Sequence, residues 1–496
     1  MKRMRICLIA EGSYPYVTGG VSNWIHALVT GMPEHEFVLH TIGAIEKQRG
    51  QFRYELPANL TAVHETFLDA GFPIRRRGRR FRLTEREKAA LAGHLGGGKT
   101  GPDRAEEGTV PPGALDWGTL FDLFRSPRLR HPADLLSSRD FLDLLVEIAS
   151  DRYGHVPFTD LFWTVCSMLL PLLVTLRQPV PQADLYHAVT TGYAGVFGGL
   201  ARHLNGRPLV VTEHGIYSRE REEEILKADW VREHFKELWI EHFYRLSACA
   251  YRYADRVLTL FARNRQIEIE LGCPPEKTGI VPNGIDVEAY ANLPVPEQPD
   301  GRFRIGAIVR IVPIKDIKTM IRSFALIKRE MPEAELYVMG PMDENGEYER
   351  ECRQLVQSLG VADVHFTGNV RVSDWLGRMD LMMLTSVSEG QPLAVLEGMA
   401  AGLPWVATDV GDCRGLIEGD GDEFGPAGIV VPVMHVEQIA AAAVRLGRDP
   451  RLRAEMGRNG RERVRKLYTR ERFVEEYRRL YADLGEAEAW RASASN

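Results

Sequence analysis

The sequence lacks any C-x-x-C pair, although it contains six cysteines. These stand far apart, at Cys7, Cys166, Cys249, Cys273, Cys352 and Cys413. A disulfide framework or a structural zinc site needs cysteines at short, repeated spacings. The scattered thiols therefore argue against both, and they favour a reducing compartment.

The chain also lacks a strong excess of charge of either sign. Its net charge is −6 over 496 residues, of which 26% are charged. Because nucleic-acid-binding proteins usually carry a basic footprint, we expect no nucleic-acid partner. The apolar content of 44% is ordinary for a globular protein, and the length exceeds what one core can use. We therefore expect two or three domains.

Long hydrophobic runs are missing as well. The longest, Leu161–Val174, is interrupted by Thr164, Ser167 and Pro171, and it falls short of the ~20 residues that a bilayer requires. We interpret it as a core helix, with a docking face for a membrane partner as the alternative. The first apolar run ends at Glu11 and is too short for a signal peptide, so we predict a strand there.

Apolar, β-rich runs alternate with helical patterns through most of the chain. The first set of predicted strands is Arg5–Ala10, Phe37–Ile42, Asp184–Val189, Pro208–Glu213, Arg256–Leu260 and Gly279–Pro282. After the polar stretch Asn292–Arg302, the second set is Phe303–Val309, Glu335–Met339, Val364–Phe366, Leu381–Leu384, Pro404–Ala407 and Gly428–Val431. Strands separated by helix-length segments indicate right-handed βαβ units. We predict an α/β protein with two Rossmann-like, doubly wound parallel-sheet domains that face a cleft. Residues Arg461–Leu484 read as one amphipathic helix.

Residues 71–160 break this alternation and are predicted to be an insertion in the first domain. They contain the arginine-rich run Arg75–Arg82. Such a run suits an anionic polymer, lipid headgroups or an acidic partner, although a solvated surface segment is the favoured interpretation.

Two short motifs resemble known sites without the context that those sites need. Gly93–Thr100 matches the P-loop string G-x-x-x-x-G-K-T, which requires a strand before it and a helix after it. Here Thr84–Leu95 reads as a helix, so we reject a P-loop. Asp420-Gly421-Asp422 resembles a D-x-D metal clamp but lies in an acidic loop, where we predict a solvated turn.

The most informative stretch is Ser388–Gly402. An apolar run, 380–386, fits a buried parallel strand just before it. Pro392 suits the first position of a helix, and Gly402 suits its left-handed end. When a strand, a tight loop and a helix follow one another, the free N–H groups at the helix start lie at the carboxyl end of the sheet and form an anion site. With carboxylates at Glu389 and Glu397, the pattern predicts a nucleotide-sugar site.

Five motifs in order carry a family resemblance. Residues 388–411 resemble the E-x7-E donor site of retaining GT-B glycosyltransferases of family 4. Ile308–Lys315, Phe366–Gly368, Val281–Asp286 and Tyr16–Val21 resemble that family's other motifs. The stretch 10–24, together with the arginine-rich insertion, more specifically resembles the cytosolic glycosyltransferases of Pel exopolysaccharide synthesis.

The resemblance implies an organisation and a reaction. Residues 1–295 would form the acceptor domain, 303–470 the nucleotide-sugar donor domain, and 471–496 a helix that crosses back to the first domain. The enzyme would move a hexose or N-acetylhexosamine from a UDP-sugar to a growing exopolysaccharide and form an α-linkage, without a metal. It would be cytoplasmic, and peripheral at the inner membrane through a membrane-bound synthase or transport complex.

The resemblance also implies roles for individual residues. Arg310 and Lys315 would neutralise the leaving phosphate, and Glu389 would bind a donor-sugar hydroxyl and stabilise an oxocarbenium-like transition state. Glu397 would hold the ribose hydroxyls. The predicted catalytic residues are Glu389, Arg310, Lys315, His187 and His214. The predicted donor-binding residues are Gly19, Gly20, Gly368, Gly390, Gln391, Pro392, Leu393 and Glu397.

The chain departs from the family at one motif. The family usually shows D-x-x-H-x-H, whereas Asp184–Val189 keeps the first histidine, His187, and has Val189 at the second. His187 and His214 each have a catalytic and a structural interpretation, and the departing phosphate can itself take the acceptor's proton. Two other functions stay open: a GT-B UDP-sugar epimerase, and a non-catalytic sugar-nucleotide-binding scaffold of a polysaccharide synthase complex.

Overall fold

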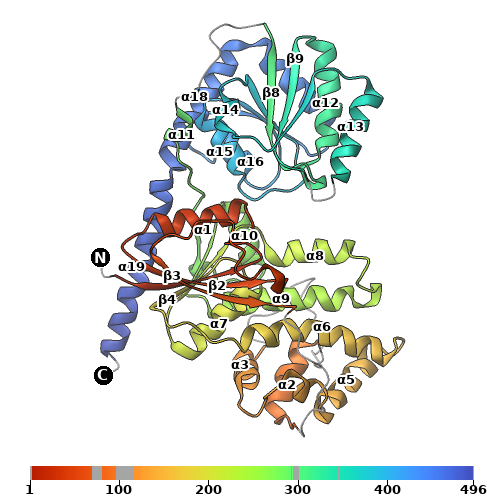
Figure 1. Cartoon of the computed structure of the whole chain (residues 1–496), viewed down its shortest axis with the longest axis vertical. Coiled ribbons are helices and arrows are strands. Elements are labelled where there is room, and N and C mark those ends of the chain that lie inside the picture. The colour runs from red at the N-terminus through yellow and green to blue at the C-terminus, as the bar shows by residue number, and fades with distance from the viewer. Residues whose placement is uncertain are drawn as a thin grey trace. The chain divides into compact units, whose positions relative to one another are not determined.

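The computed structural model describes residues 3–69, 81–96, 115–291, 293, 301–342 and 346–494. The chain divides into two compact units, one formed by Met1–Val281 with Glu476–Asn496 and the other by Pro282–Glu475. In Figure 1 the colour follows the residue number from red at the N-terminus to blue at the C-terminus, so the reader can trace each unit along the chain.

The first unit is built on a seven-stranded parallel sheet. Its strands are β1 (Arg5–Glu11), β2 (Glu36–Gly43), β3 (Leu60–Phe67), β4 (Leu185–Ala188), β5 (Leu209–Glu213), β6 (Arg256–Thr259) and β7 (Thr278–Ile280). They run in the order β3-β2-β1-β4-β5-β6-β7. Strands β1 and β4 are buried almost throughout, as their unbroken apolar runs predict. The chain changes direction across the sheet between them.

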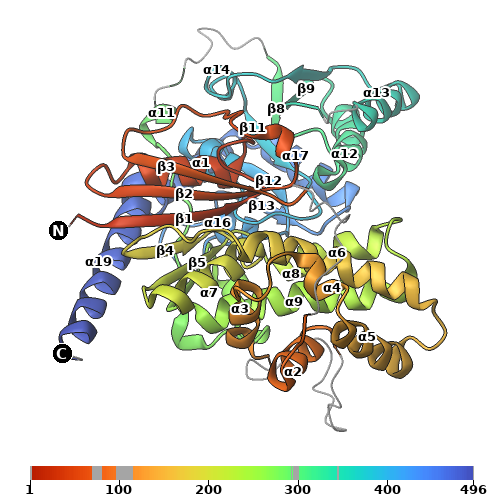
Figure 2. The same cartoon turned by 60° about the horizontal axis from the view of Figure 1, so that its bottom comes forward.

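Helices cover this sheet and add a second layer beyond it. The helices that connect successive strands include α1 (Gly20–Thr30), α7 (Tyr193–Asn205), α8 (Tyr217–Lys227), α9 (Lys236–Tyr253) and α10 (Ala262–Glu270). Between β3 and β4 the chain forms α2 (Glu85–His94), α3 (Trp117–Arg125), α4 (Pro132–Leu136), α5 (Arg139–Arg152) and α6 (Phe158–Leu176), which lie together in Figure 2. Residues Arg75–Arg80 lie outside the described residues. The rejected P-loop string begins inside the last turn of helix α2, at Gly93, rather than after a strand, and its residues 97–100 lie outside the described residues.

Helix α6 is the one described helix that is long and apolar enough to cross a membrane. Its most apolar window is 56% buried within the structure. Leu169, Leu172 and Leu173 are fully buried in the core of the first unit. The packing supports the interpretation of this run as a core helix.

The second unit is built on a six-stranded parallel sheet. Its strands are β8 (Phe303–Ile308), β9 (Ala334–Met339), β10 (Val364–Gly368), β11 (Leu381–Leu384), β12 (Trp405–Thr408) and β13 (Gly428–Val431), in the order β10-β9-β8-β11-β12-β13. Its helices are α11 (Glu288–Ala291), α12 (Ile317–Glu330), α13 (Glu347–Leu359), α14 (Ser373–Leu376), α15 (Leu393–Ala400), α16 (Cys413–Glu418), α17 (Val436–Arg448) and α18 (Pro450–Leu467). The strand order reverses between β8 and β11, which makes the carboxyl ends of these strands a topological switch point.

Every strand predicted from the sequence is present, with ends that differ by one or two residues at most. Strand β3 was missed. It lies at the edge of the described sheet, pairs with β2 on one side, and leaves Thr61 and His64 exposed. Because an edge strand needs apolar residues over only part of its length, its sequence lacks the continuous run that identifies a buried parallel strand.

The single helix predicted over Arg461–Leu484 is wrong. Helix α18 ends at Leu467, and α19 (Arg470–Ala494) begins after a break. The break exists because Ile285 pairs with the backbone there: its N–H donates to Tyr468 O (2.9 Å) and its carbonyl accepts from Arg470 N (2.9 Å). From Glu476 onward α19 belongs to the first unit, where Tyr481 is fully buried.

The solvated turn predicted at Asp420–Asp422 is also wrong for its second carboxylate. The Arg463 side chain of α18 is completely buried, and its guanidinium donates to Asp422 Oδ2 (2.6 Å) and Oδ1 (2.9 Å). The same group also donates to the carbonyls of Leu416, Ile417 and Gly425. A buried cation requires a partner of opposite charge, so Asp422 is an internal counter-ion. Asp420 is exposed.

Candidate donor-binding site

The switch point of the second sheet joins the loop after β8 to the loop after β11. The Thr385 hydroxyl donates to the carbonyls of Lys315 (3.1 Å) and Asp316 (3.0 Å). The N–H of Val387 donates to Ile314 O (2.9 Å). These bonds hold the two loops side by side at the strand ends, where ligands of open α/β sheets bind.

Lys315 and Glu389 meet across these loops. Lys315 Nζ donates to Glu389 Oε1 at 2.5 Å, and the Ser386 hydroxyl donates to the same oxygen at 2.6 Å. The two charged side chains are 17% and 10% exposed. An ammonium carries three N–H donors, so this one retains two for another anion. The geometry places a cation and an oriented carboxylate together, while their roles in donor binding stay predictions.

Arg310 follows β8 at the same edge of the sheet. Its side chain is exposed. Among the residues that the structure describes, its guanidinium makes no hydrogen bond or ion pair. A positive charge next to the Lys315 loop is therefore available to a ligand that carries phosphate.

Helix α15 begins directly after the β11 loop, one residue later than predicted. Pro392 is the residue before the helix, and its backbone is extended, with φ −73° and ψ 115°. No side chain caps the helix, so the amides of its first turn present donors and a partial positive charge. Gly402 follows the helix in the left-handed region, φ +79°, as predicted.

Gln391 ties this loop to two other segments. Its side-chain oxygen accepts from Asn283 N (2.6 Å), and its Nε2 donates to Asp412 Oδ2 (2.7 Å). Gly411 is confined to glycine, because a Cβ there would lie 2.1 Å from Gly390 O and its φ is +52°. Burial raises the pKa of Asp412 to about 7. Sequence reasoning missed Asp412 and Ser386, for which the only signal is their position just after a strand.

Glu397 lies about one turn into α15 and is partly buried. Burial raises the pKa of its carboxyl to about 7, and a hydrogen bond from the Tyr290 hydroxyl opposes the rise. Tyr290 belongs to the short helix α11. Nothing in the sequence around Tyr290 indicated this contact, because it depends on how α11 packs against α15.

The raised pKa of Glu397 predicts a pH-dependent stability. Because the folded carboxyl binds its proton more tightly than the unfolded one, this contribution is complete below about pH 4.5 and is lost as the pH rises through about 7. Urea titrations measure the free energy of unfolding from about pH 5 to 8. Over that range it should fall by roughly 1–2 kcal/mol less in Glu397→Gln than in the parent protein. Glu437→Gln, on an exposed side chain, should leave the slope unchanged. An unaltered slope in Glu397→Gln would contradict the assignment.

The predicted glycines lie in separate places. Gly19 and Gly20 stand at the start of α1 in the first unit, are exposed, and have no atom within 4 Å of the point where a Cβ would stand. The fold around them therefore leaves open space. Gly368 ends β10, which β9 separates from β8, so it does not adjoin the Lys315 and Glu389 loops.

The two histidines differ in their surroundings. His187 is fully buried, and its ring nitrogens contact the hydroxyls of Tyr481 (2.7 Å) and Thr212 (2.8 Å). Burial lowers its pKa to about 3. With both nitrogens engaged, the structural interpretation of His187 is favoured over the catalytic one. Burial lowers the pKa of His214 to about 4, and its Nε2 has no partner among the described residues. His214 keeps both interpretations.

Another polar cluster stands away from these loops. Ligand atoms of Glu335, Asp363 and His365 lie within 4.8 Å of one another. Cations already pair with the two carboxylates, since Arg304 lies 3.4 Å from Glu335 and Lys328 lies 2.5 Å from Asp363. The cluster is therefore explained by ion pairs.

Comparisons with known proteins match this architecture. The chain is 28% identical over 270 residues to the MMP alpha-(1->4)-mannosyltransferase of Mycolicibacterium hassiacum, covering 53% of this chain and 62% of that protein. It is 26% identical over 293 residues to the amylovoran biosynthesis glycosyltransferase AmsK of Erwinia amylovora, covering 56% and 65%. The chain spans between 43% and 62% of the length of the first three curated relatives that it matches.

A solved structure, Anabaena HepE in complex with UDP-glucose, superimposes with a TM-score of 0.59 at 15% identity, covering 97% of this chain and all of that one. This likeness confirms the predicted GT-B fold. Residues 302–449, which contain the Lys315 and Glu389 loops, match the family described as "Glycosyl transferases group 1". Residues 4–276, more than half of the chain, match the family described as "Domain of unknown function (DUF3492)". The chain therefore belongs to the DUF3492 family, and its residues 302–449 are similar to the group 1 glycosyl transferases.

Proposed function

We propose that this protein is a retaining glycosyltransferase that moves a hexose or N-acetylhexosamine from a UDP-sugar to a growing exopolysaccharide and forms an α-glycosidic bond. The observation that carries the proposal is the Lys315–Glu389 pair at the switch point, beside the uncapped start of α15. The group 1 match over the same residues supports it. The UDP-glucose bound to HepE supports the choice of donor.

The residues divide the work of cleaving a sugar–diphosphate bond. The remaining N–H donors of Lys315, the Arg310 guanidinium and the amides that open α15 would hold the diphosphate and stabilise its growing charge. Glu389 would stabilise the positive charge that develops on the sugar ring. The acceptor oxygen bonds to the anomeric carbon as the bond to phosphate breaks, and the departing phosphate takes the acceptor's proton. Glu397 would accept hydrogen bonds from the ribose hydroxyls.

The finer assignment rests on resemblance to PelF, the glycosyltransferase of Pel exopolysaccharide synthesis. AmsK, whose name places it in the biosynthesis of another exopolysaccharide, supports a polymer as the acceptor. A secreted polymer must cross a membrane, so we propose a membrane-bound synthase or transport complex as the partner. The protein would act in the cytoplasm, peripheral at the inner membrane, and would need no metal.

Replacing Lys315 by Ala should weaken donor binding by about 1–3 kcal/mol, since one charged hydrogen-bond donor to phosphate is lost. Isothermal titration with UDP-sugars measures the change. Lys318→Ala is the matched control, because Lys318 lies on the neighbouring turn and pairs with Glu351 (2.8 Å). Equal donor affinities in the two variants would remove Lys315 from the site.

NMR analysis of products tests the proposed reaction itself. With a UDP-sugar and an oligosaccharide acceptor, the proposal predicts UDP release and a new α-linked sugar. A changed UDP-sugar without any acceptor would instead establish an epimerase. Donor binding without turnover would establish a scaffold.

A further inference from the structure

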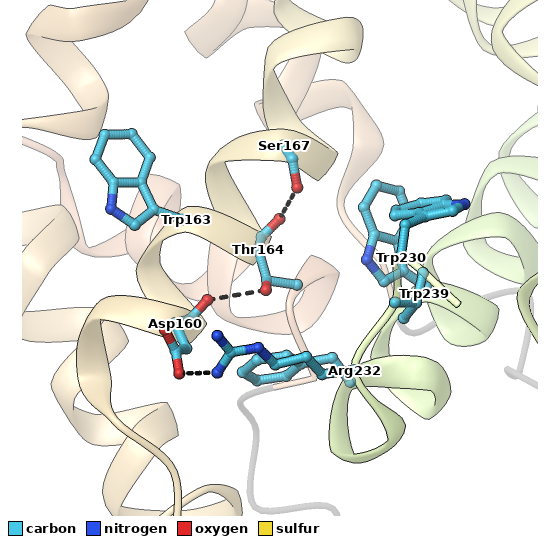
Figure 3. Close-up of a pocket in the computed structure, with 9 residues that line it drawn as sticks. Asp160, Trp163, Thr164, Ser167, Trp230, Arg232 and Trp239 are labelled. Atoms are coloured by element: carbon cyan, nitrogen blue, oxygen red, sulfur yellow. Dashed lines mark hydrogen bonds and ion pairs between the residues drawn. The ribbon is translucent and has the colours of Figure 1, made fainter. Parts of the chain in front are cut away.

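A cavity of ≈ 260 Å³ lies between α6 and the segment that leads into α9, in the first unit. Figure 3 shows Thr164 and Ser167 of α6 on one side and the rings of Trp230 and Trp239 on the other. Asp160 and Arg232 close one end. The cavity is lined by α6, by residues 230–235 and by α9, rather than by strand ends, so the proposed donor chemistry does not use it.

The indole rings of Trp230 and Trp239 form part of the apolar lining of this cavity, together with Trp163, Val231 and Phe235. Trp230 is 70% exposed, whereas Trp239 is almost buried. Their ring centroids lie 5.5 Å apart at 82°, so they meet edge to face. An indole left this exposed lowers its free energy when a partner covers it. In the view of Figure 3 the ring of Trp163 points away from these two.

Polar groups face the rings. Arg232 forms an ion pair with Asp160 and keeps most of its five N–H donors. The Thr164 hydroxyl donates to Asp160 O (2.8 Å), and the Ser167 hydroxyl donates to Thr164 O (2.7 Å). Because these hydroxyl hydrogens are used within α6, the oxygens present lone pairs as acceptors. The cavity thus offers donors, acceptors and aromatic faces within one small volume.

We propose that this cavity binds sugar rings of the glycan acceptor, at a subsite separate from the donor site; the inference rests on the proposed function. A pyranose ring has an apolar face of C–H groups, which suits an indole, and a rim of hydroxyls, which suits the Arg232–Asp160 pair and the α6 hydroxyls. The volume lies just below the roughly 300–1,000 Å³ of drug-sized sites, which fits a ring or two rather than a protein segment. A protein surface that binds lipid usually carries protruding apolar side chains beside cations that are free to contact headgroups. Arg232 is paired with Asp160, which argues against a lipid ligand here.

Titration of the full-length protein with cellohexaose, maltohexaose and chitohexaose, without donor, tests the subsite. At least one hexaose should bind, and Trp230→Ala should weaken it roughly three- to tenfold, the effect of losing one aromatic contact. Trp230→Phe should restore most of the affinity. Leu226→Ala is the control, because Leu226 is an exposed apolar residue of α8 outside the cavity. UDP-sugar affinity should stay unchanged in all three variants.

Several outcomes would overturn the proposal. They are the absence of hexaose binding, equal binding by Trp230→Ala, and an equal loss in Leu226→Ala. Binding to phosphatidylglycerol vesicles that Trp230→Ala abolishes, with no hexaose binding, would assign the cavity to a membrane surface. Because these titrations contain no donor, they report on the cavity even if UDP-sugar binding and turnover, which test the proposed function, both fail.

Discussion

Glu389→Gln should lower kcat by about 10²–10³-fold while changing donor affinity little. The carboxylate is held in place by Lys315 and Ser386, so its charge is already oriented before the reaction begins. An oriented charge of this kind acts mainly on the transition state, and removing one such group typically costs about 2.7–4 kcal/mol. The isosteric amide keeps the shape of the side chain and loses its charge.

Donor binding separates this effect from a general disruption of the loop. A neutral side chain beside the diphosphate reduces repulsion, so affinity for the UDP-sugar should be preserved or slightly improved. Single-turnover kinetics and calorimetry measure the two quantities separately. Glu351→Gln, at the surface partner of Lys318, serves as the control. Normal turnover in Glu389→Gln would refute its catalytic assignment.

Asp422→Ala is expected to have the largest effect on stability, a loss of about 3–5 kcal/mol in the free energy of unfolding. The substitution leaves the Arg463 guanidinium fully buried without its counter-ion. The three backbone carbonyls that also bind Arg463 satisfy its donors but do not neutralise its charge. Urea unfolding followed by circular dichroism measures the loss.

Asp420→Ala is the matched control for this prediction, since it removes the other carboxylate of the same D-x-D string. Asp420 is exposed, so the change should stay within about 0.5 kcal/mol. Pairing Asp422→Ala with Arg463→Met should recover part of the loss, because the buried charge is removed as well. Similar stabilities for the two single variants would show that the Arg463 pair is not structural.

The sheets could be predicted from the sequence because their central strands are buried on both faces. Runs such as Leu381–Leu384 carry that environment in their composition, and the structure places them within two residues of the predicted bounds. The edge strand β3 and the break at Tyr468–Thr469 could not be predicted in the same way. Each depends on a partner distant in sequence, β2 in one case and Ile285 in the other.

The candidate site divides along the same line. That Lys315 and Glu389 lie at the same strand ends follows from topology, because strand ends converge at a switch point, whereas their roles stay predictions. The Tyr290 hydroxyl on Glu397 and the two hydroxyls that engage His187 could not, since they depend on packing between helices and strands. A sequence motif identifies which residue types are present. Their protonation states and unused hydrogen-bond donors depend on the residues that pack around them in the fold.

A crystal structure of the full-length protein with a bound UDP-sugar tests the central claim most directly. The account predicts that the diphosphate oxygens lie within hydrogen-bond distance of Lys315 Nζ and of the first amides of α15, with the ribose hydroxyls on Glu397. A sugar nucleotide bound elsewhere, with the Lys315–Glu389 loops empty, would contradict it.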